Sequence, residues 1–163
     1  MANTDTVIKN ALWNDKYCDL YLANGKVLEL LDSAETGPDS HPDATTYDAD
    51  GALLLPGLID SHVHLRDPGQ EYKEDIDSGL HAAASGGFSH VMAMANTVPV
   101  NDQAEITEYM LNKANKNHPC GPFLHPIGAL TKNLQGKELA PLKELAQTGC
   151  IAFSNDGIPI QDT

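Results

Sequence analysis

The chain has 163 residues, enough for a domain with its own hydrophobic core, and its formal charge of −13 argues against nucleic acid or an anionic membrane as a partner. No apolar run is long enough to cross a membrane, and the N-terminus lacks the basic, apolar and small-residue regions of a secretory signal. The three cysteines, Cys18, Cys120 and Cys150, form no Cys-x-x-Cys pair, so we expect reduced thiols in a cytoplasmic protein.

The first part of the chain, residues 1–55, is predicted to form a small β layer. Short apolar runs predict strands at residues 6–11, 19–22, 27–30 and 53–55. Asn24-Gly25 lies between the second and third of these runs, and this dipeptide is typical of β-hairpin turns because both residues accept a positive φ. Residues 32–47 are polar and rich in Pro, Gly, Ser and Asp, which predicts a loop.

From residue 56 onward, strands are predicted to alternate with helices. After a first strand that leads into residues 60–66, apolar runs predict strands at residues 88–95, 123–128 and 150–154. Apolar residues at helical spacing predict helices at residues 74–85, 103–115 and 138–147. Asp102 is the predicted N-cap of the second helix. This order favours a right-handed parallel sheet, either a doubly wound sheet complete at this length or four strands of a larger barrel.

The first strand of this region carries a His-x-His pair. An uninterrupted apolar run leads into it, which predicts an inner strand, and alternation puts Asp60, His62, His64 and Arg66 on one face. Two imidazoles two residues apart can hold one metal ion, although such pairs also occur as ordinary surface or core histidines. Arg66 is the only arginine, and its planar guanidinium suits a carboxylate. The strand therefore predicts a metal site beside a receptor for a small anionic substrate.

Polar residues that follow the other strands are the next candidates, because the carboxyl ends of parallel strands meet at one edge of the sheet. Asn96 follows the second strand, and its amide can donate to and accept from a substrate carboxylate or carbamoyl group. Asp156 follows the fourth strand, and a carboxylate beside two histidines suits zinc. Taken singly, each is better explained as a turn residue.

Four stretches in the same order resemble the motifs of dihydroorotases of the aspartate-bridged, class I type in the amidohydrolase superfamily: residues 55–69, 86–102, 126–132 and 152–157. The resemblance implies an α/β fold, the N-terminal part of an amidohydrolase (β/α)8 TIM-like barrel with a small β-sandwich. Residues 1–55 would be the sandwich segment, and residues 56–163 the first four strands and three helices of the barrel. The pattern runs to the last residue, so we expect part of a longer protein.

The resemblance also implies roles for individual residues. His62, His64 and Asp156 would bind one or two zinc ions, and His64, Arg66 and Asn96 would bind substrate. Ala95 stands where the family usually has proline, which leaves the neighbouring amide in place. A proton-shuttling aspartate and two further histidine ligands are expected beyond Thr163, so this chain would hold no catalytic residue and be inactive alone. The other histidines are assigned to surface or packing roles, with His118 in a solvent-exposed turn.

The function that the resemblance implies is the reversible, metal-dependent cyclisation of N-carbamoyl-L-aspartate to L-dihydroorotate in pyrimidine biosynthesis. The partners expected are this small-molecule substrate and either a second copy in a homo-oligomer or aspartate transcarbamoylase. One alternative is a non-catalytic dihydroorotase-like partner of aspartate transcarbamoylase. Another is a related cyclic amidohydrolase, an allantoinase or a hydantoinase. These relatives generally bridge their metals with a carboxylated lysine, and no lysine lies near Asp156 in the sequence, which favours the aspartate-bridged type.

Overall fold

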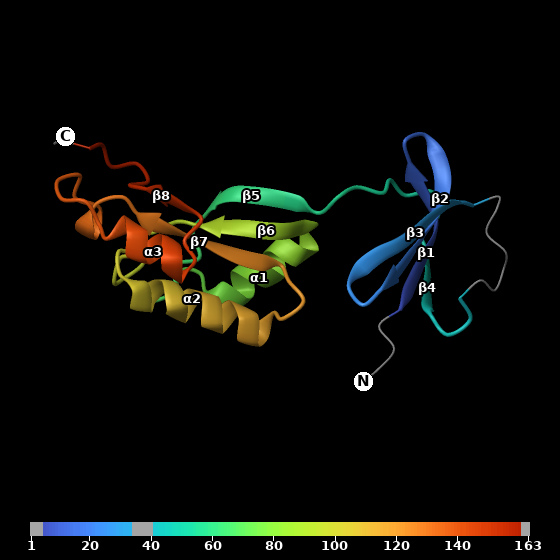
Figure 1. The fold of residues 1–163 in the computed structure, drawn as a ribbon, viewed down its shortest axis with the longest axis horizontal. Helices are drawn as coiled ribbons and strands as arrows, with labels where there is room; N and C mark the ends of the chain where they lie inside the picture. The colour runs from blue at the N-terminus through green and yellow to red at the C-terminus, as the bar shows by residue number, and fades with distance from the viewer. Residues whose placement is uncertain (1–4, 34–40, 161–163) are drawn as a thin grey trace. The chain divides into compact units, whose positions relative to one another are not determined.

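The computed structural model describes residues 5–33 and 41–160, and the chain divides into two compact units, Met1–Pro56 and Gly57–Thr163 (Figure 1). The first unit contains a four-stranded sheet with the order β3-β2-β1-β4. Its first three strands pair antiparallel and β4 lies parallel to β1. The bounds are β1 (Thr6–Trp13), β2 (Lys16–Ala23), β3 (Lys26–Asp32) and β4 (Thr45–Asp48). The first unit is therefore β-rich, as predicted.

The hairpin between β2 and β3 is confirmed, because Asn24 and Gly25 have positive φ angles of 53° and 71°. The predicted loop at residues 32–47 is wrong at its end, where β4 begins. Its Thr-Thr-Tyr sequence favours a strand, but the Pro- and Asp-rich composition of the whole stretch concealed it. Residues 34–40 of that loop lie outside the described residues. The predicted strand at residues 53–55 is also wrong, since Leu53 makes only a single bridge to Leu12.

The second unit contains a parallel sheet whose strands follow one another in chain order, β5-β6-β7-β8 (Figure 1). A doubly wound sheet would reverse its strand order at a switch point, so the sequential order supports the barrel-type alternative. The elements are β5 (Leu58–Val63), α1 (Ile76–Ser85), β6 (Phe88–Ala93), α2 (Ala104–Asn117), β7 (Phe123–Ala129), a 3₁₀ turn η1 (Lys132–Leu134), α3 (Leu142–Thr148) and β8 (Ala152–Ser154).

The main hydrophobic core of this unit lies between the sheet and the first two helices. Ile76 and Leu80 of α1 and Met110 of α2 are fully buried. They pack with Val91 of β6 and Leu124 of β7. The helical spacing of these residues is what buries one face of each helix, so the core is the one that the sequence predicts.

Three predicted helix starts are displaced, each for a local reason. The first helix begins at Ile76, because Asp75 forms a capping box with Ser78. Asp102 does not cap α2, since its carboxylate accepts the backbone N–H of Asn133 at 2.7 Å. The third helix begins only after Pro141, because the predicted first turn instead forms a bridge between Leu139 and Thr131.

The strand β5 differs from its prediction in two ways. It ends at Val63, and Arg66 has a φ of 59°, so strand alternation does not extend to Arg66. Within the described residues β5 is also an edge strand, with Leu58 and Ile59 exposed, so the prediction of an inner strand is wrong for this sheet. The apolar run indicated burial, but no described strand pairs with the outer edge of β5.

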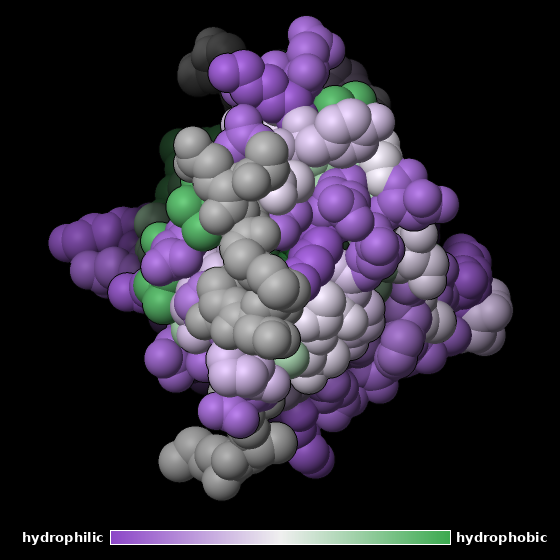
Figure 2. All heavy atoms as spheres, turned by 90° about the vertical axis from the view of Figure 1, so that its right-hand side faces the viewer, coloured by the Kyte–Doolittle hydropathy of each residue, from purple (hydrophilic) through white to green (hydrophobic). Residues whose placement is uncertain are grey.

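One face of the molecule is largely polar. Figure 2 shows a face on which hydrophilic residues and residues of intermediate hydropathy predominate, with hydrophobic residues in small groups. Among residues 5–33 and 41–160, no helix combines the length and the hydropathy needed to span a membrane. The three cysteines are free thiols, as predicted, and Cys18 and Cys150 are buried.

Candidate metal centre

The three predicted metal ligands come together at the carboxyl end of the sheet. His62 is the penultimate residue of β5, His64 follows that strand, and Asp156 lies two residues beyond β8. The Nε2 atoms of the two histidines are 3.3 Å apart, and His62 Nε2 is 3.3 Å from Asp156 Oδ1. One ligand atom from each residue lies within 4.8 Å of the other two.

This convergence joins the two edge strands of the sheet. In a flat sheet, strands three places apart are separated by about 14 Å, which is three times the interstrand spacing. The approach of Asp156 to His62 therefore requires the sheet to curve around its carboxyl end, as the strands of an α/β barrel do. The curvature follows from the twist of parallel strands with helices on the outer face.

The donor set fits a zinc ion. Zinc takes imidazole nitrogen and carboxylate oxygen at about 2.0–2.1 Å, and the edge of such a tetrahedron is about 3.3–3.4 Å long. Both measured separations from His62 Nε2 are 3.3 Å. The His62 side chain is 55% exposed and the Asp156 side chain 25% exposed, so the site is open to solvent and to additional ligands.

Asn96 connects two of these residues. Its Nδ2 donates to Asp156 Oδ2 at 3.0 Å, and its Oδ1 lies 2.9 Å from His64 Nδ1. An ionised carboxylate only accepts, so the amide nitrogen must face Asp156 and the amide oxygen must face His64. His64 Nδ1 then carries the proton that it donates, which leaves the Nε2 lone pair directed at the shared centre. Asn96 was predicted to bind substrate, and no sequence pattern indicated this orienting contact.

Arg66 lies in the loop after β5 and is half-buried. Its backbone carbonyl accepts the N–H of Gln70 at 2.9 Å, which closes a turn around it. Within the part of the chain that the structure describes, no hydrogen bond or ion pair engages its guanidinium. The group is therefore available to a ligand, although it reaches this place through a left-handed turn and not through strand alternation.

Asn155 directly precedes Asp156, and the sequence prediction did not identify it as a residue that supports the site. It is buried, and its Oδ1 accepts both the backbone N–H and the hydroxyl of Thr131 at 3.0 Å. These bonds tie the turn after β8 to the segment after β7. An asparagine directly after a short strand is a recognisable signal for such a turn, but its partner at position 131 could not be read from the sequence.

The other histidines form no metal cluster among the described residues. His90 and His125 pair with each other through Nδ1 and Nε2 at 2.8 Å, well before the strand ends. The prediction that His118 is solvent-exposed is wrong: its side chain is only 9% exposed and its ring packs edge-on to His81. It is buried because it follows the last residue of α2 directly and faces Asp77 of α1.

Comparisons with known proteins agree with this fold. Residues 51–163 match the family model described as dihydro-orotase-like. A dihydroorotase from Geotalea daltonii is 47% identical over 146 residues, covering 90% of this chain and 33% of that protein. A dihydroorotase from Syntrophus aciditrophicus is 43% identical over 150 residues, covering 91% of this chain and 34% of that protein. The chain thus spans about a third of the length of these curated relatives.

Solved structures with the same fold include two hydantoinases. An L-hydantoinase from Arthrobacter aurescens has a TM-score of 0.69 at 22% identity, over 92% of this chain and 32% of that one. A D-hydantoinase has a TM-score of 0.60 at 27% identity, over 78% of this chain and 28% of that one. The sequential parallel sheet and these neighbours define an amidohydrolase-type α/β barrel fold. Within that class, the chain belongs to the dihydroorotase-like family.

Proposed function

We propose that this chain carries metal-binding and substrate-binding residues of a dihydroorotase, which interconverts N-carbamoyl-L-aspartate and L-dihydroorotate in pyrimidine biosynthesis. The proposal rests on the convergence of His62, His64 and Asp156 within 4.8 Å, in a chain of the dihydroorotase-like family. We propose one or two zinc ions as the metal, because the donors are two imidazoles and a carboxylate.

The roles proposed for the metal-site residues follow from their contacts. His62 and His64 offer Nε2, and Asp156 offers Oδ1 while Asn96 holds its other oxygen. When bound, a zinc ion polarises a carbonyl oxygen and makes water a better nucleophile near neutral pH. Asn96 keeps His64 in the tautomer that such an ion requires and prevents the Asp156 carboxylate from rotating.

Substrate binding is assigned mainly to Arg66. Its guanidinium can bind the substrate carboxylate with two parallel hydrogen bonds. This local positive charge is needed because the chain carries a formal charge of −13, which repels an anion. Both ends of the Asn96 amide are engaged, so Asn96 contacts substrate only by exchanging one of its present bonds.

A second candidate function is the hydrolysis of another cyclic amide, as the likeness to the D-hydantoinase suggests. Among the described residues, the candidate metal group consists of an aspartate and two histidines. The lysine nearest in sequence to Asp156, Lys143, lies on α3 before β8. An aspartate follows β8, and no lysine follows Lys143 in the sequence, which favours the dihydroorotase over the hydantoinase alternative.

The test uses a chimera in which this chain replaces the matching third of the Geotalea daltonii dihydroorotase. Ring opening of dihydroorotate and cyclisation of N-carbamoyl-aspartate are measured with the zinc-loaded protein. We expect turnover in both directions, lost in the His62→Ala and Asp156→Ala variants and retained in His81→Ala, a control on an exposed residue of α1. Circular dichroism verifies that each variant is folded.

Two outcomes would contradict the proposal. A folded, zinc-loaded chimera that hydrolyses a hydantoin or allantoin but not dihydroorotate would support the related amidohydrolase. A folded, zinc-loaded chimera without turnover on any of these substrates would support a non-catalytic role, such as the support of aspartate transcarbamoylase.

A further inference from the structure

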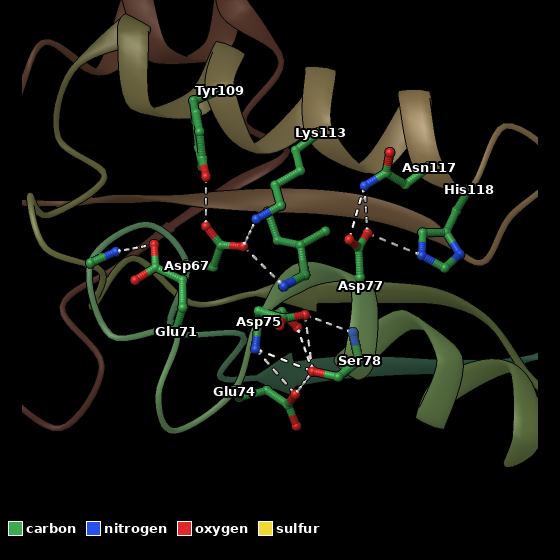
Figure 3. Close-up of polar contacts among 12 residues, drawn as sticks. Asp67, Glu71, Glu74, Asp75, Asp77, Ser78, Tyr109, Lys113, Asn117 and His118 are labelled. Atoms are coloured by element: carbon green, nitrogen blue, oxygen red, sulfur yellow. Dashed lines mark hydrogen bonds and ion pairs between the residues drawn. The ribbon is translucent and has the colours of Figure 1, made fainter.

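Asp67, in the loop after β5, has a completely buried carboxylate (Figure 3). Its Oδ1 accepts the hydroxyl of Tyr109 at 2.9 Å. Its Oδ2 accepts Lys113 Nζ at 2.7 Å and the backbone N–H of Ile76 at 3.1 Å. A buried carboxylate is costly unless it is paired and hydrogen-bonded, and here each oxygen has a partner. We call Asp67, Tyr109 and Lys113 the Asp67 anchor.

The anchor ties one loop to two helices. Tyr109 and Lys113 lie one turn apart on the same face of α2, and Ile76 is the first residue of α1. The hydrogen bond between Lys113 and Asp67 raises the pKa of Lys113, so the ammonium group stays charged well above neutral pH. Burial, followed by the hydrogen bond to Asp67, raises the pKa of the Tyr109 hydroxyl, which therefore remains a donor.

The anchored loop is also joined to the loop that carries Asn96. The backbone N–H of Val98, two residues after Asn96, donates to the carbonyl of Pro68 at 2.9 Å. Gly69 has a φ of 94°, and a Cβ at this position would lie 1.9 Å from the Val98 carbonyl oxygen. Only glycine permits this approach. The segment that follows Arg66 and the segment that follows Asn96 are therefore in direct backbone contact.

We propose that Asp67 is a positioning residue that, through Lys113 and Tyr109, holds the backbone of Arg66 and the joined Asn96 loop in the geometry that binds the substrate carboxylate. This inference rests on the proposed dihydroorotase function. A buried ion pair is weak evidence for stability, since apolar residues of similar volume often stabilise as well. The ion pair between Asp67 and Lys113 holds the residue after Arg66 in a single geometry. The backbone of Arg66 itself is in the left-handed region.

The first measurement is amide hydrogen exchange in the full 163-residue chain. The reporters are the amides of Gln70 and Val98, which donate to Arg66 and Pro68. In Asp67→Asn and Lys113→Met, we expect their exchange to accelerate about tenfold more than that of the core amide of Val91. Lys113→Arg should restore slow exchange because it keeps the charge. Lys116→Met, on an exposed residue of α2, is the matched control and should behave as the parent chain.

The second measurement is the steady-state kinetics of the same variants in the Geotalea daltonii chimera. The guanidinium of Arg66 would hold a carboxylate that does not react, so we expect KM to rise about tenfold while kcat changes less than about threefold. Lys113→Arg should return KM toward the parent value. A merely structural role would lower the active fraction, and hence kcat, without changing KM.

The outcomes separate this inference from the function on which it rests. A parent chimera without dihydroorotase turnover overturns the proposed function, and hydrogen exchange then decides whether the anchor holds the loops. Equal acceleration at Gln70, Val98 and Val91, or no acceleration at all, overturns the anchor. An active parent chimera whose Asp67→Asn variant loses kcat at constant KM overturns the positioning role.

Discussion

Two histidine pairs on the same parallel sheet differ in what surrounds them. His62 and His64 lie at the end of β5 with their Nε2 atoms 3.3 Å apart, and a carboxylate oxygen of Asp156 completes the group. His90 and His125 each occupy the third position of their strands, β6 and β7, and their ring nitrogens are 2.8 Å apart. No acidic residue joins this second pair into a ligand group within the described chain.

The difference shows what makes a histidine pair a candidate metal site. A separation of 2.8 Å is a hydrogen bond, which consumes the lone pair that a metal would need. In the first group, His62 Nε2 lies 3.3 Å from the ligand atoms of both His64 and Asp156. Asn96 engages the other ring nitrogen of His64, which leaves the Nε2 lone pair free. The position of a histidine relative to the end of its strand is therefore more informative than the presence of a partner.

The largest expected effect is a difference in zinc affinity between variants of the two histidine pairs. Replacing His62 or Asp156 by alanine should weaken zinc binding to the chain about 100-fold or more, because each removes one of three donors. Replacing His90 or His125 by alanine should leave zinc affinity within about twofold of the parent. Titration calorimetry against a competing chelator measures both. Equal losses in the two sets of variants would mean that the site described here is not where zinc binds.

A smaller effect is expected from Asn96, which contacts two of the proposed ligands without being one. Asn96→Ala should weaken zinc binding about tenfold, since loss of an orienting partner typically costs tenfold to a hundredfold in metal affinity. Asn112→Ala, on an exposed residue of α2, is the control. If zinc affinity is unchanged in Asn96→Ala while substrate affinity falls, Asn96 acts on the substrate alone, as the family resemblance implies.

Much of the fold could be predicted from local patterns. Asn24-Gly25 defined a hairpin, and Ile76, Leu80 and Met110 defined the buried faces of two helices. The convergence of His62, His64 and Asp156 could be anticipated as well, because it requires only that parallel strands end at one edge. These features depend on short-range periodicity and topology, which the sequence carries explicitly.

Contacts between distant side chains could not be predicted in this way. The sequence predicts Asp102 as a helix cap, but its carboxylate instead accepts the backbone N–H of Asn133, 31 positions later. Lys113 binds Asp67 across 46 positions, although charged residues nearer in the chain were available to both. Such choices depend on which groups the packed helices bring together. An isolated strand pattern likewise could not show that Arg66 lies beyond the end of β5.

The smallest expected effect is a pH dependence that belongs to the second histidine pair. Burial, followed by repulsion from His90, lowers the pKa of His125 below its ordinary value of 6.5. As the pH falls through the range between 6.5 and this lowered pKa, the unfolded chain takes up the proton first. The free energy of unfolding should therefore decrease on acidification through this range, and it should recover as the pH rises above 6.5.

Thermal unfolding monitored by circular dichroism at pH 7 and pH 5 can isolate this contribution. His125→Gln removes the titrating group while keeping a polar side chain, so it should reduce the loss of unfolding temperature on acidification by about 2 °C. Asn112→Gln, at an exposed position of α2 that carries no ionisable group, should leave that loss unchanged. If His125→Gln and the parent chain respond equally to acid, the His90–His125 contact does not persist in solution. The contrast with His62 and His64 would then rest on the position of the strand ends alone.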